Sequence, residues 1–397
     1  MNFSARRTPC PGRSIAAARY PASCMATSCS SQIAPEVRIP WTKTTDGRTA
    51  GCGAASSPGR RVVLGSNRGL TISGVLHGGT TAWTVVSSCG GGARSSWGRP
   101  VHAGRYPGAV LIDLHTHSTA SDGTDAPGQV VADAAAAGLD VVALTDHDTV
   151  AGWPDAAAAA RANRIALVRG AELSAQAVFE AEGRERHVSV HILSYLHDPA
   201  DAPLAQECER VRTARLDRAR RMVDLLARDY PVDWDEIAAH TEPGATVGRP
   251  HLADALVRLG VVPDRSAAFE TVLHAGSPYY VPHYAPRAVD TVRRVREAGG
   301  VPVFAHPAAS VRGRTVPDDV IEELADAGLA GLEAHHRDHT PDQVDHLVGL
   351  AARLGLLVTG SSDYHGAGKP NRLAENTTAP EVLERIEDMG TLAVIRS

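Results

Sequence analysis

The sequence lacks the apolar stretches that membrane insertion and export require. None of its 397 residues falls in an apolar run of about 18 residues, the length that crosses a bilayer. A secretory signal needs an apolar region after a basic start, but Pro9, Pro11, Arg13 and Arg19 interrupt every candidate. We therefore predict a protein that has no contact with a membrane.

Cysteine is nearly absent after residue 108. Of the six cysteines, Cys208 alone lies beyond that point. The spacings of Cys24, Cys29 and Cys52 match neither a paired zinc-binding motif nor a disulfide framework. A single cysteine in the rest of the chain fits a reducing compartment, which predicts a cytoplasmic protein.

Acidic residues are nearly absent from residues 1–108. This segment holds 13 of the 40 basic residues and two of the 45 acidic residues, which leaves 27 basic and 43 acidic residues, a net charge of −16, for residues 109–397. Its only strand-like pieces span 62–64 and 81–86, too little apolar surface to offset the entropy of ordering. We expect a low-complexity, disordered extension, or a misplaced start codon with the real start near Val110 or Leu111. A basic nucleic-acid arm is the alternative, but aromatic residues do not interleave with its arginines.

Residues 109–397 repeat one local pattern. An Ala-rich amphipathic stretch is followed by a glycine, a short apolar run and polar residues, with the glycine at Gly138, Gly299, Gly328 and Gly355. The glycine suits the end of a helix, and the apolar run suits a strand buried on both faces. The segment 340–343, Thr-Pro-Asp-Gln, suits a helix start. Further strands are expected at 110–117, 165–172, 187–196 and 391–396. About eight alternating units predict a parallel α/β barrel.

Polar side chains follow these strands, at the end of a barrel where the loops converge. His115 and His117 are two residues apart on one strand, so their rings share a face and can converge on one ion. Asp113 shares that face and suits a role in orienting these ligands. The remaining candidates are Asp122, His147, Glu172, His191, His306, Asp363 and His365. These nine nitrogen and oxygen ligands exceed the needs of one ion, so two or three divalent ions are predicted, with Glu172 as the bridge.

The motifs around these residues resemble those of the PHP (polymerase and histidinol phosphatase) superfamily. They are His115-Thr-His117, Thr145-Asp-His147-Asp, Glu172-x-Ser174, His191, His306-Pro and Ser362-Asp363-Tyr-His365-Gly. The resemblance covers about 111–397 and implies a distorted (β/α)7 barrel with a trinuclear metal site for phosphoester hydrolysis. It places the ligands in three sets: His115, His117, Glu172 and Asp363; Glu172, His191 and His306; and Asp122, His147 and His365. The catalytic residues implied are Asp122, His147, Glu172, Asp363 and His365.

The segment between His191 and His306 is long enough to hold an inserted helical cap. The expected organisation is an extension at 1–108, a barrel at 109–199 and 286–397, and a cap at 200–285. Seven arginines between residues 204 and 230 alternate with acids, and most are expected on a solvated helix face. Arg249 and His251, in a Gly-Arg-Pro-His motif that opens a helix, are the candidate phosphate contacts. An Arg paired with a nearby Asp and a capping His is the alternative.

The Gly-Arg-Pro-His segment resembles the nucleotide-directed branch of the superfamily, whose members cleave 5′-nucleotides, 3′,5′-bisphosphonucleotides or short RNA 5′ ends. The predicted activity is hydrolysis of nucleotide phosphomonoesters by a hydroxide that bridges two ions. Manganese is the expected metal, with zinc or iron as alternatives. The expected partners are small phosphorylated nucleotides or short oligonucleotides, without an obligate protein partner. Histidinol-phosphate hydrolysis and a non-catalytic metal- or nucleic-acid-binding module remain as alternatives, although the net charge of −16 opposes broad nucleic-acid binding.

Overall fold

The computed structural model describes residues 61–63, 70–77, 80–87, 110–310 and 313–396. Contacts divide the chain into two units, Met1–Ser96 and Trp97–Ser397. In the first unit, β1 (Arg61–Val63), β2 (Leu70–His77) and β3 (Thr80–Ser87) form an antiparallel sheet. The sequence indicated strand character near β1 and β3 but not at β2, where Ser73 and Gly74 interrupt the apolar run. The rest of the extension predicted at 1–108 lies outside the described residues.

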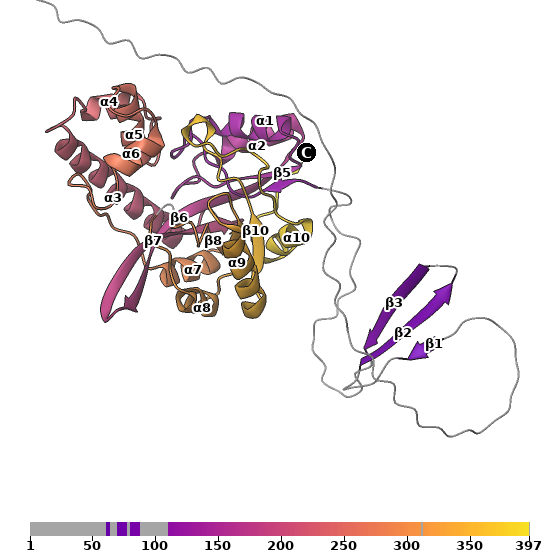
Figure 1. Ribbon diagram of the computed structural model, residues 1–397. Helices are drawn as coiled ribbons and strands as arrows, with labels where there is room; N and C mark the ends of the chain where they lie inside the picture. Colours follow the sequence, from indigo (N-terminus) through magenta and orange to yellow (C-terminus); the bar gives the residue numbers. More distant parts are fainter. Residues whose placement is uncertain (1–60, 64–69, 78–79, 88–109, 311–312, 397) are drawn as a thin grey trace, which may run out of the picture. The chain divides into compact units, whose positions relative to one another are not determined.

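The second unit is built on a seven-stranded sheet with the order β10-β9-β8-β7-β6-β5-β4 (Figure 1). Its strands are β4 (Ile112–Asp113), β5 (Val141–Leu144), β6 (Ala166–Ala181), β7 (Arg184–Tyr195), β8 (Val301–Phe304), β9 (Gly331–His335) and β10 (Leu357–Gly360). Its helices are α1 (Pro127–Ala136), α2 (Trp153–Asn163), α3 (Ala202–Leu226), α4 (Trp234–Ala239), α5 (Arg249–Arg258), α6 (Arg265–Thr271), α7 (Ala288–Glu297), α8 (Asp318–Asp326), α9 (Pro341–Leu354) and α10 (Pro380–Met389). Within the described ranges, no helix combines the length and apolarity needed to cross a bilayer.

The sheet closes almost completely into a barrel. Beyond the ends of the edge strands β4 and β10, Thr116 and Tyr364 form a parallel bridge, and His117 N donates to Tyr364 O at 2.8 Å. Thr378 N also donates to Ile112 O at 2.9 Å, which ties the chain after β10 to β4. Because β4 and β10 are joined by these bonds rather than by a full ladder, the barrel is distorted. The predicted distorted (β/α)7 barrel is therefore confirmed.

One strand of the barrel runs against the others. β7 pairs antiparallel with both β6 and β8, whereas the other neighbouring strands pair in parallel. The reason is local: Glu182 and Gly183, between β6 and β7, have φ of 54° and 68°, the backbone of a two-residue hairpin turn. The strand expected at 391–396 is also absent as a ladder, since Ile395 makes only an isolated bridge with Leu167.

The start and the end of α9 agree with the sequence signals for them. The hydroxyl of Thr340 accepts from Gln343 N at 3.3 Å, and Gln343 Oε1 accepts from Thr340 N at 2.8 Å, which confirms the predicted start of α9. Gly355, which ends this helix, has φ of 70°, a conformation that favours glycine.

Helices α3–α6 form a group with its own hydrophobic core. Met222, Leu226, Leu252, Leu256 and Leu273 are fully buried within this cluster, which is distinct from the clusters packed around the sheet. In Figure 1 these helices gather at one side of the barrel. The α3–α6 group therefore packs as a unit, and it carries both the arginine-rich helix and the Gly-Arg-Pro-His motif.

Candidate metal centre

The nine predicted ligands converge at one end of the barrel. Seven of them lie in the loops that follow β4, β5, β8 and β10: His115, His117, Asp122, His147, His306, Asp363 and His365. The other two lie inside strands, because β6 and β7 continue past the end of the barrel as a hairpin. The register of that hairpin places Ser174 opposite His191 and Glu172 opposite Leu193, so Glu172 and His191 are close neighbours.

The first group is formed by four ligand atoms. His115 Nε2 lies 3.0 Å from His117 Nε2 and 3.4 Å from Glu172 Oε2, and His117 Nε2 lies 3.2 Å from that same oxygen. Asp363 Oδ1 lies 3.5 Å from His115 Nε2 and 3.4 Å from His117 Nε2. Ligand atoms held about 2.0–2.2 Å from one ion in a tetrahedron lie about 3.3–3.6 Å apart. His115, His117 and Glu172 therefore lie at distances close to those of a coordination shell, and Asp363 lies beside the two histidines.

Glu172 takes part in two groups at once. Its Oε2 belongs to the group just described and also lies 3.1 Å from His147 Nδ1. Its Oε1 lies 2.8 Å from His191 Nδ1 and 3.0 Å from His306 Nε2. A carboxylate whose two oxygens face different sets of imidazoles has the arrangement needed to bridge two cations.

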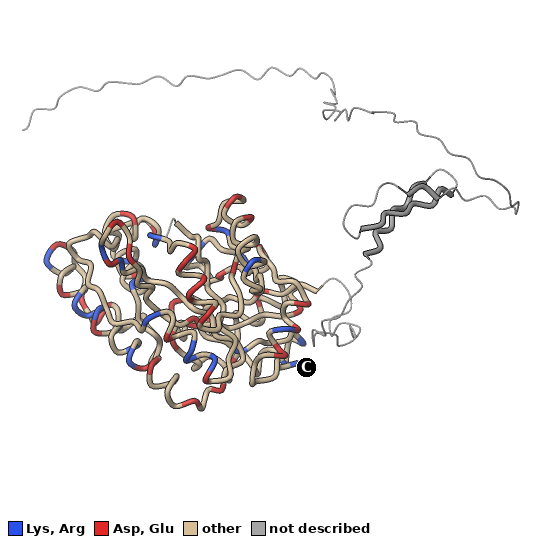
Figure 2. The backbone as a smooth tube through the Cα atoms, turned by 90° about the horizontal axis from the view of Figure 1, so that it is seen from below, with Lys and Arg blue, Asp and Glu red and all other residues tan. Residues whose placement is uncertain are grey.

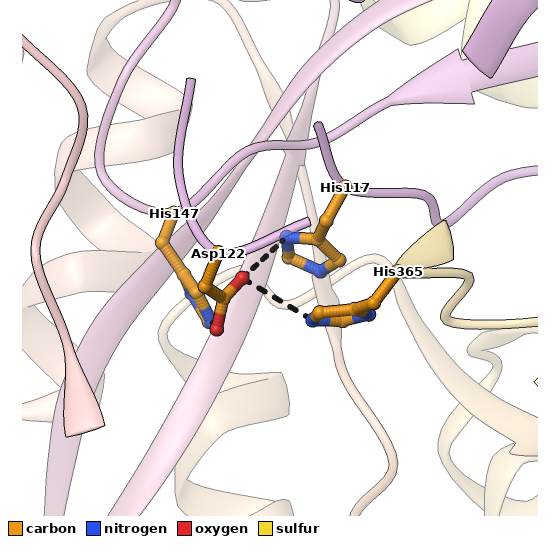
Figure 3. A group of neighbouring side chains, drawn as sticks. All are labelled: His117, Asp122, His147 and His365. Atoms are coloured by element: carbon orange, nitrogen blue, oxygen red, sulfur yellow. Dashed lines mark ion pairs between the residues drawn. The ribbon is translucent and has the colours of Figure 1, made fainter. Parts of the chain in front are cut away.

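A third group surrounds Asp122. Its Oδ1 lies 3.2 Å from His365 Nε2 and 3.6 Å from His117 Nδ1, and its Oδ2 lies 3.6 Å from His147 Nε2. Figure 3 shows the carboxylate between the three rings. The ligand atoms of all four residues lie within 4.8 Å of one another. His117 was not predicted in this group; its two ring nitrogens face different groups.

The burial of these side chains tests whether they suit a cation. Asp122 Oδ1, His147 Nδ1, His191 Nδ1 and His365 Nε2 are buried and make no hydrogen bond. An unpaired buried polar atom costs about 1–3 kcal/mol. A divalent cation would satisfy these atoms together, and imidazole nitrogens and carboxylate oxygens are donors that such ions accept. The residues therefore fit divalent metal ions.

Charge in the cluster leads to the same conclusion. Burial alone would raise the pKa of the Glu172 carboxyl, but the imidazoles of His191, His147 and His115 outweigh it and hold that pKa well below its usual range. Burial alone would lower the pKa of His117, but the carboxylates of Asp363 and Glu172 raise it to about 9. The carboxylates of the cluster are therefore ionised, and a positive charge next to them, such as that of a bound cation, is favourable.

Two of the ligands have an uncommon backbone conformation. His306 has φ of 34° and Asp363 has φ of 54°. A non-glycine residue adopts such a conformation at a cost of about 1–3 kcal/mol, so it persists only where the surroundings impose it. At both positions the strand has just ended, and the turn of the backbone carries the side chain into the ligand groups.

Glu333 supports the centre directly. It lies in β9 and is fully buried. Its Oε1 lies 2.9 Å from His115 Nδ1 and also accepts from the Ser361 hydroxyl, while its Oε2 accepts from His306 N at 2.8 Å. The carboxylate therefore fixes the ring of one ligand and the backbone of another. The signal in the sequence was an acid between the apolar residues Leu332 and Ala334 of a short strand.

Replacing Glu333 by Gln is expected to weaken manganese binding about 10- to 100-fold, because His115 loses the carboxylate that orients its ring. Titration calorimetry of chelator-treated protein measures the change. Glu322→Gln, the same substitution at an exposed position of α8, is the matched control. Equal affinities for the two variants would show that the contact between Glu333 and His115 does not support the metal ligands.

Asp113 does not act as the sequence predicted. Its Oδ1 accepts from Ser362 N at 3.0 Å and its Oδ2 accepts from Ala374 N at 3.1 Å, whereas toward His115 it reaches only the backbone N, at 3.4 Å. Asp113 lies one step deeper in the barrel, where the chain after β10 passes beside it. It therefore holds the backbone next to Asp363 rather than a histidine ring.

The loop that carries Asp122 depends on a glycine. A Cβ at Gly123 would lie 2.5 Å from His117 O and 2.8 Å from Ser118 N, both backbone atoms. We expect Gly123→Ala to displace Asp122 and to lower catalytic activity more than about tenfold, since a misplacement of about 1 Å can cost a hundredfold. Gly349→Ala in α9 is the control, because a Cβ there meets nothing within 4 Å. Equal activities in a steady-state assay would refute the role of this close approach.

The α3–α6 group is bonded to the same loop. Thr246 N donates to Ala120 O at 3.0 Å, and an Arg265 guanidinium N–H donates to Asp122 O at 3.1 Å. Arg265 also binds both oxygens of Asp254, at 2.5 and 2.6 Å. The helical group and the metal-binding loop are thus held in register by hydrogen bonds.

Arg249 and His251 lie at the start of α5 in different surroundings. The guanidinium of Arg249 lies over the rings of Phe269 and Tyr280, at 5.2 and 5.6 Å, and donates to Leu273 O at 3.1 Å. It forms no ion pair with the described carboxylates, so the alternative of an Arg–Asp pair is not observed among the described residues. His251 Nδ1 accepts from Gly248 N at 3.1 Å, so this histidine does cap the helix.

Three basic residues near the centre were missed by sequence reasoning. Arg215 and Arg218 were expected on a solvated helix face, but each is only 6% exposed, because that face of α3 is covered within the fold. Lys369, one of two lysines in the chain, donates from Nζ to Asp363 Oδ2 at 2.9 Å. The rarity of lysine beside 38 arginines was a signal that could have singled out Lys369.

Comparisons with known proteins agree with this geometry. Residues 113–235 match the PHP domain family. The chain is 36% identical over 262 residues to a 3′,5′-nucleoside bisphosphate phosphatase of Chromobacterium violaceum, covering 66% of this chain and 89% of that protein. It is 33% identical over 264 residues to a phosphoribosyl 1,2-cyclic phosphate 1,2-diphosphodiesterase of Eggerthella lenta, covering 65% and 95%. A solved structure from Bifidobacterium adolescentis, described as a metal-dependent phosphoesterase, has a TM-score of 0.68 and 40% identity, covering 72% of this chain and 98% of that one.

Proposed function

Because this chain belongs to the PHP domain family and is a metal-dependent phosphoesterase, we propose that it hydrolyses phosphomonoesters of nucleotides, with 5′-AMP and 3′,5′-nucleoside bisphosphates as substrates. The observation that carries the proposal is the convergence of five imidazoles, from His115, His117, His147, His191 and His306, on the two oxygens of Glu172. The relative named for bisphosphate hydrolysis supports the choice of a nucleotide over other phosphomonoesters.

The ligand groups would hold two or three divalent ions, with manganese as the metal. The first site would use His115, His117, Glu172 and Asp363; the second Glu172, His191 and His306; the third Asp122, His147 and His365. Bound ions supply Lewis acidity toward the phosphoryl oxygens and lower the pKa of coordinated water toward neutrality.

Residues outside the ligand groups hold the ligands in position. Glu333 holds the His115 ring and the His306 backbone, and Asp113 holds the backbone that leads to Asp363. Lys369 neutralises the oxygen of Asp363 that faces away from His115 and His117. Fixed ligands of this kind need little rearrangement as charge develops on the phosphoryl group.

Arg249 and His251 would contact the substrate from the side of the α3–α6 group, which we propose as a cap covering 200–285. The Arg249 guanidinium is held by two aromatic rings without a carboxylate partner among the described residues, so its charge is available to a phosphate. His251 lies near enough to Asp122 for that carboxylate to oppose the effect of burial, which lowers its pKa. His251 thus borders the Asp122 group.

A general nucleic-acid-binding role has less support. Residues 109–397 carry a net charge of −16, and binding to a phosphate backbone depends on neutralising it with basic residues. Figure 2 shows acidic and basic residues interspersed along the outer helices. A pocket for a small phosphorylated substrate fits this distribution better than an extended basic surface does.

Phosphate release by the full chain with Mn²⁺ tests the proposal. The substrates are 5′-AMP, 3′,5′-bisphosphoadenosine, histidinol phosphate, ribose 1,2-cyclic phosphate and a short 5′-phosphorylated RNA. We expect the highest kcat/KM with one of the two nucleotides. Preference for histidinol phosphate or for the cyclic ester would reject the proposed substrate class, and release from none of the five would reject the proposed activity.

A further inference from the structure

Arg265, the first residue of α6, connects the α3–α6 group with two loops that carry metal ligands. Its Nε and one terminal N–H donate to the two oxygens of Asp254 in α5, at 2.5 and 2.6 Å. Its other terminal nitrogen donates to the backbone oxygen of Asp122 at 3.1 Å. A Cβ at Gly368 would collide with the same guanidinium, so Arg265 also packs against the loop that follows His365. Asp122 and His365 thus have a common neighbour in the α3–α6 group.

The guanidinium of Arg265 is held in one orientation. A bidentate pair between an arginine and a carboxylate fixes the direction of the remaining N–H groups. The Arg265 side chain is only 12% exposed, so little room is left for another rotamer. In the part of the chain that the structure describes, no second group donates to the Asp122 oxygen. Arg265 therefore supplies the bond that fixes this carbonyl.

The beginning of the same loop is held from the barrel instead. Asp146, which follows β5, accepts from Ser118 N and from the Ser118 hydroxyl, both at 2.7 Å, and from the Ser121 hydroxyl at 2.6 Å. These bonds end one residue before Asp122. The barrel therefore holds the loop as far as Ser121, whereas the Asp122 backbone is held from the α3–α6 group.

The loop that carries Asp122 is also joined to the loop that carries His365. Thr124 N donates to His365 O at 3.1 Å, and Ala367 N donates to the Thr124 hydroxyl at 2.8 Å. The two ligand side chains meet at 3.2 Å, between Asp122 Oδ1 and His365 Nε2. A shift of the Asp122 backbone would therefore change the position of both ligands.

The other two ligand groups have their supports in the barrel. Glu172 lies in β6 and His191 lies in β7. Glu333 of β9 holds the ring of His115 and the backbone of His306. The contacts of Arg265 are thus specific to the Asp122 group.

We propose that Arg265 is a positioning residue for the third metal site, so that an ion binds there tightly only while the α3–α6 group is docked on the loop. The inference rests on the proposed function, in which Asp122, His147 and His365 would hold the third ion. A ligand whose backbone is fixed in advance loses less conformational freedom when an ion binds. The α3–α6 group thereby determines whether the centre holds two ions or three. Because linkage is reciprocal, an ion at this site stabilises the docked group by the same free energy.

A Mn²⁺ titration of the chelator-treated full chain, with free Mn²⁺ measured by electron paramagnetic resonance, tests the proposal. We expect the wild type to bind three ions. Arg265→Gln should weaken one of the three sites about 10- to 100-fold and leave the other two within about threefold. Arg258→Gln is the matched control, because Arg258 also lies in the α3–α6 group but pairs with Glu236 of α4, at 2.9 Å. An unchanged affinity at all three sites, or an equal loss at all three, would overturn the proposal.

A second pair of variants identifies the affected site. In a His365→Ala background, which lacks a ligand of the third site, Arg265→Gln should cause no further loss of Mn²⁺ affinity, since the two changes act on one site. A further loss as large as in the wild type would place the effect elsewhere and overturn the proposal. If Arg265→Gln does not fold, Asp254→Asn takes its place, because it loosens the same guanidinium. The same selective loss is expected, and its absence would reject the proposal.

The failure of this inference can be distinguished from the failure of the proposed function. The titration contains no substrate, so its result does not depend on which nucleotide is hydrolysed. A wild type that binds two ions would overturn the inference and leave hydrolysis by two ions in place. In steady-state assays, the kcat of Arg265→Gln should recover when Mn²⁺ is raised about a hundredfold, which offsets a loss of affinity of that size. A kcat that stays low at every Mn²⁺ concentration would show that Arg265 does not act through the ion.

Discussion

Replacing Glu172 by Gln is expected to remove at least one metal ion per chain and to lower kcat with a nucleotide substrate more than about a thousandfold, above the loss typical of a single stabilising donor. Its two oxygens lie within 2.8–3.4 Å of five imidazole nitrogens, so no other described ligand is shared so widely. An amide of the same shape keeps one oxygen but loses the negative charge that would bridge two cations.

Metal content by plasma mass spectrometry and steady-state kinetics measure these two effects. Glu180→Gln, at an exposed position of the same strand, is the control and should keep both the metal and the activity. A Glu172→Gln protein with full metal content and a kcat within threefold of the wild type would refute the bridging role.

Removing the metal is expected to lower the melting temperature of the protein by about 5 °C or more. The unpaired buried atoms of the ligand groups would no longer be satisfied. An ion present at a hundred times its dissociation constant stabilises the native state by about 2.7 kcal/mol, and each kcal/mol shifts the melting temperature of a large domain by about 2–4 °C.

Differential scanning calorimetry before and after treatment with EDTA measures this shift, and added Mn²⁺ should reverse it. The Glu172→Gln variant should show a smaller shift than the wild type, since part of the binding is already lost. An unchanged melting temperature in EDTA would contradict ion binding at these groups.

The ligand residues could be predicted from the sequence because most of them lie directly after a predicted strand. His147, His306, Asp363 and His365 follow short apolar strands, and parallel strands of a barrel bring such positions together. His115 and His117 are two residues apart on one strand, so their side chains point to the same face whatever the fold around them.

The burial of Arg215 and Arg218 could not be found in this way. Along α3 both residues alternate with acids, a pattern that predicts a solvated helix face. Their burial depends on how the α3–α6 group lies against the chain near Ser174 and Gly248, contacts between residues far apart in sequence. The same holds for Asp113, whose partners Ser362 and Ala374 lie about 250 residues later in the sequence, after β10.

The direction of β7 was predicted wrongly, although a local signal for it is present in the sequence. A repeated pattern of strand and helix predicted parallel strands, but the two-residue turn at Glu182 and Gly183 reverses the chain. The sequence Glu-Gly between two apolar alternations carried that signal locally. The hairpin also explains why Glu172 and His191 lie inside strands, with Glu172 at the centre of the ligand groups.

An anomalous difference map from crystals of the full chain grown with Mn²⁺ is the most direct test of the metal centre. We expect one peak among His115, His117 and Asp363 and another beside His191 and His306, with Glu172 between them. A third peak is expected beside Asp122. A map with no peak within ligand distance of Glu172 would contradict the central claim that these residues bind catalytic metal ions.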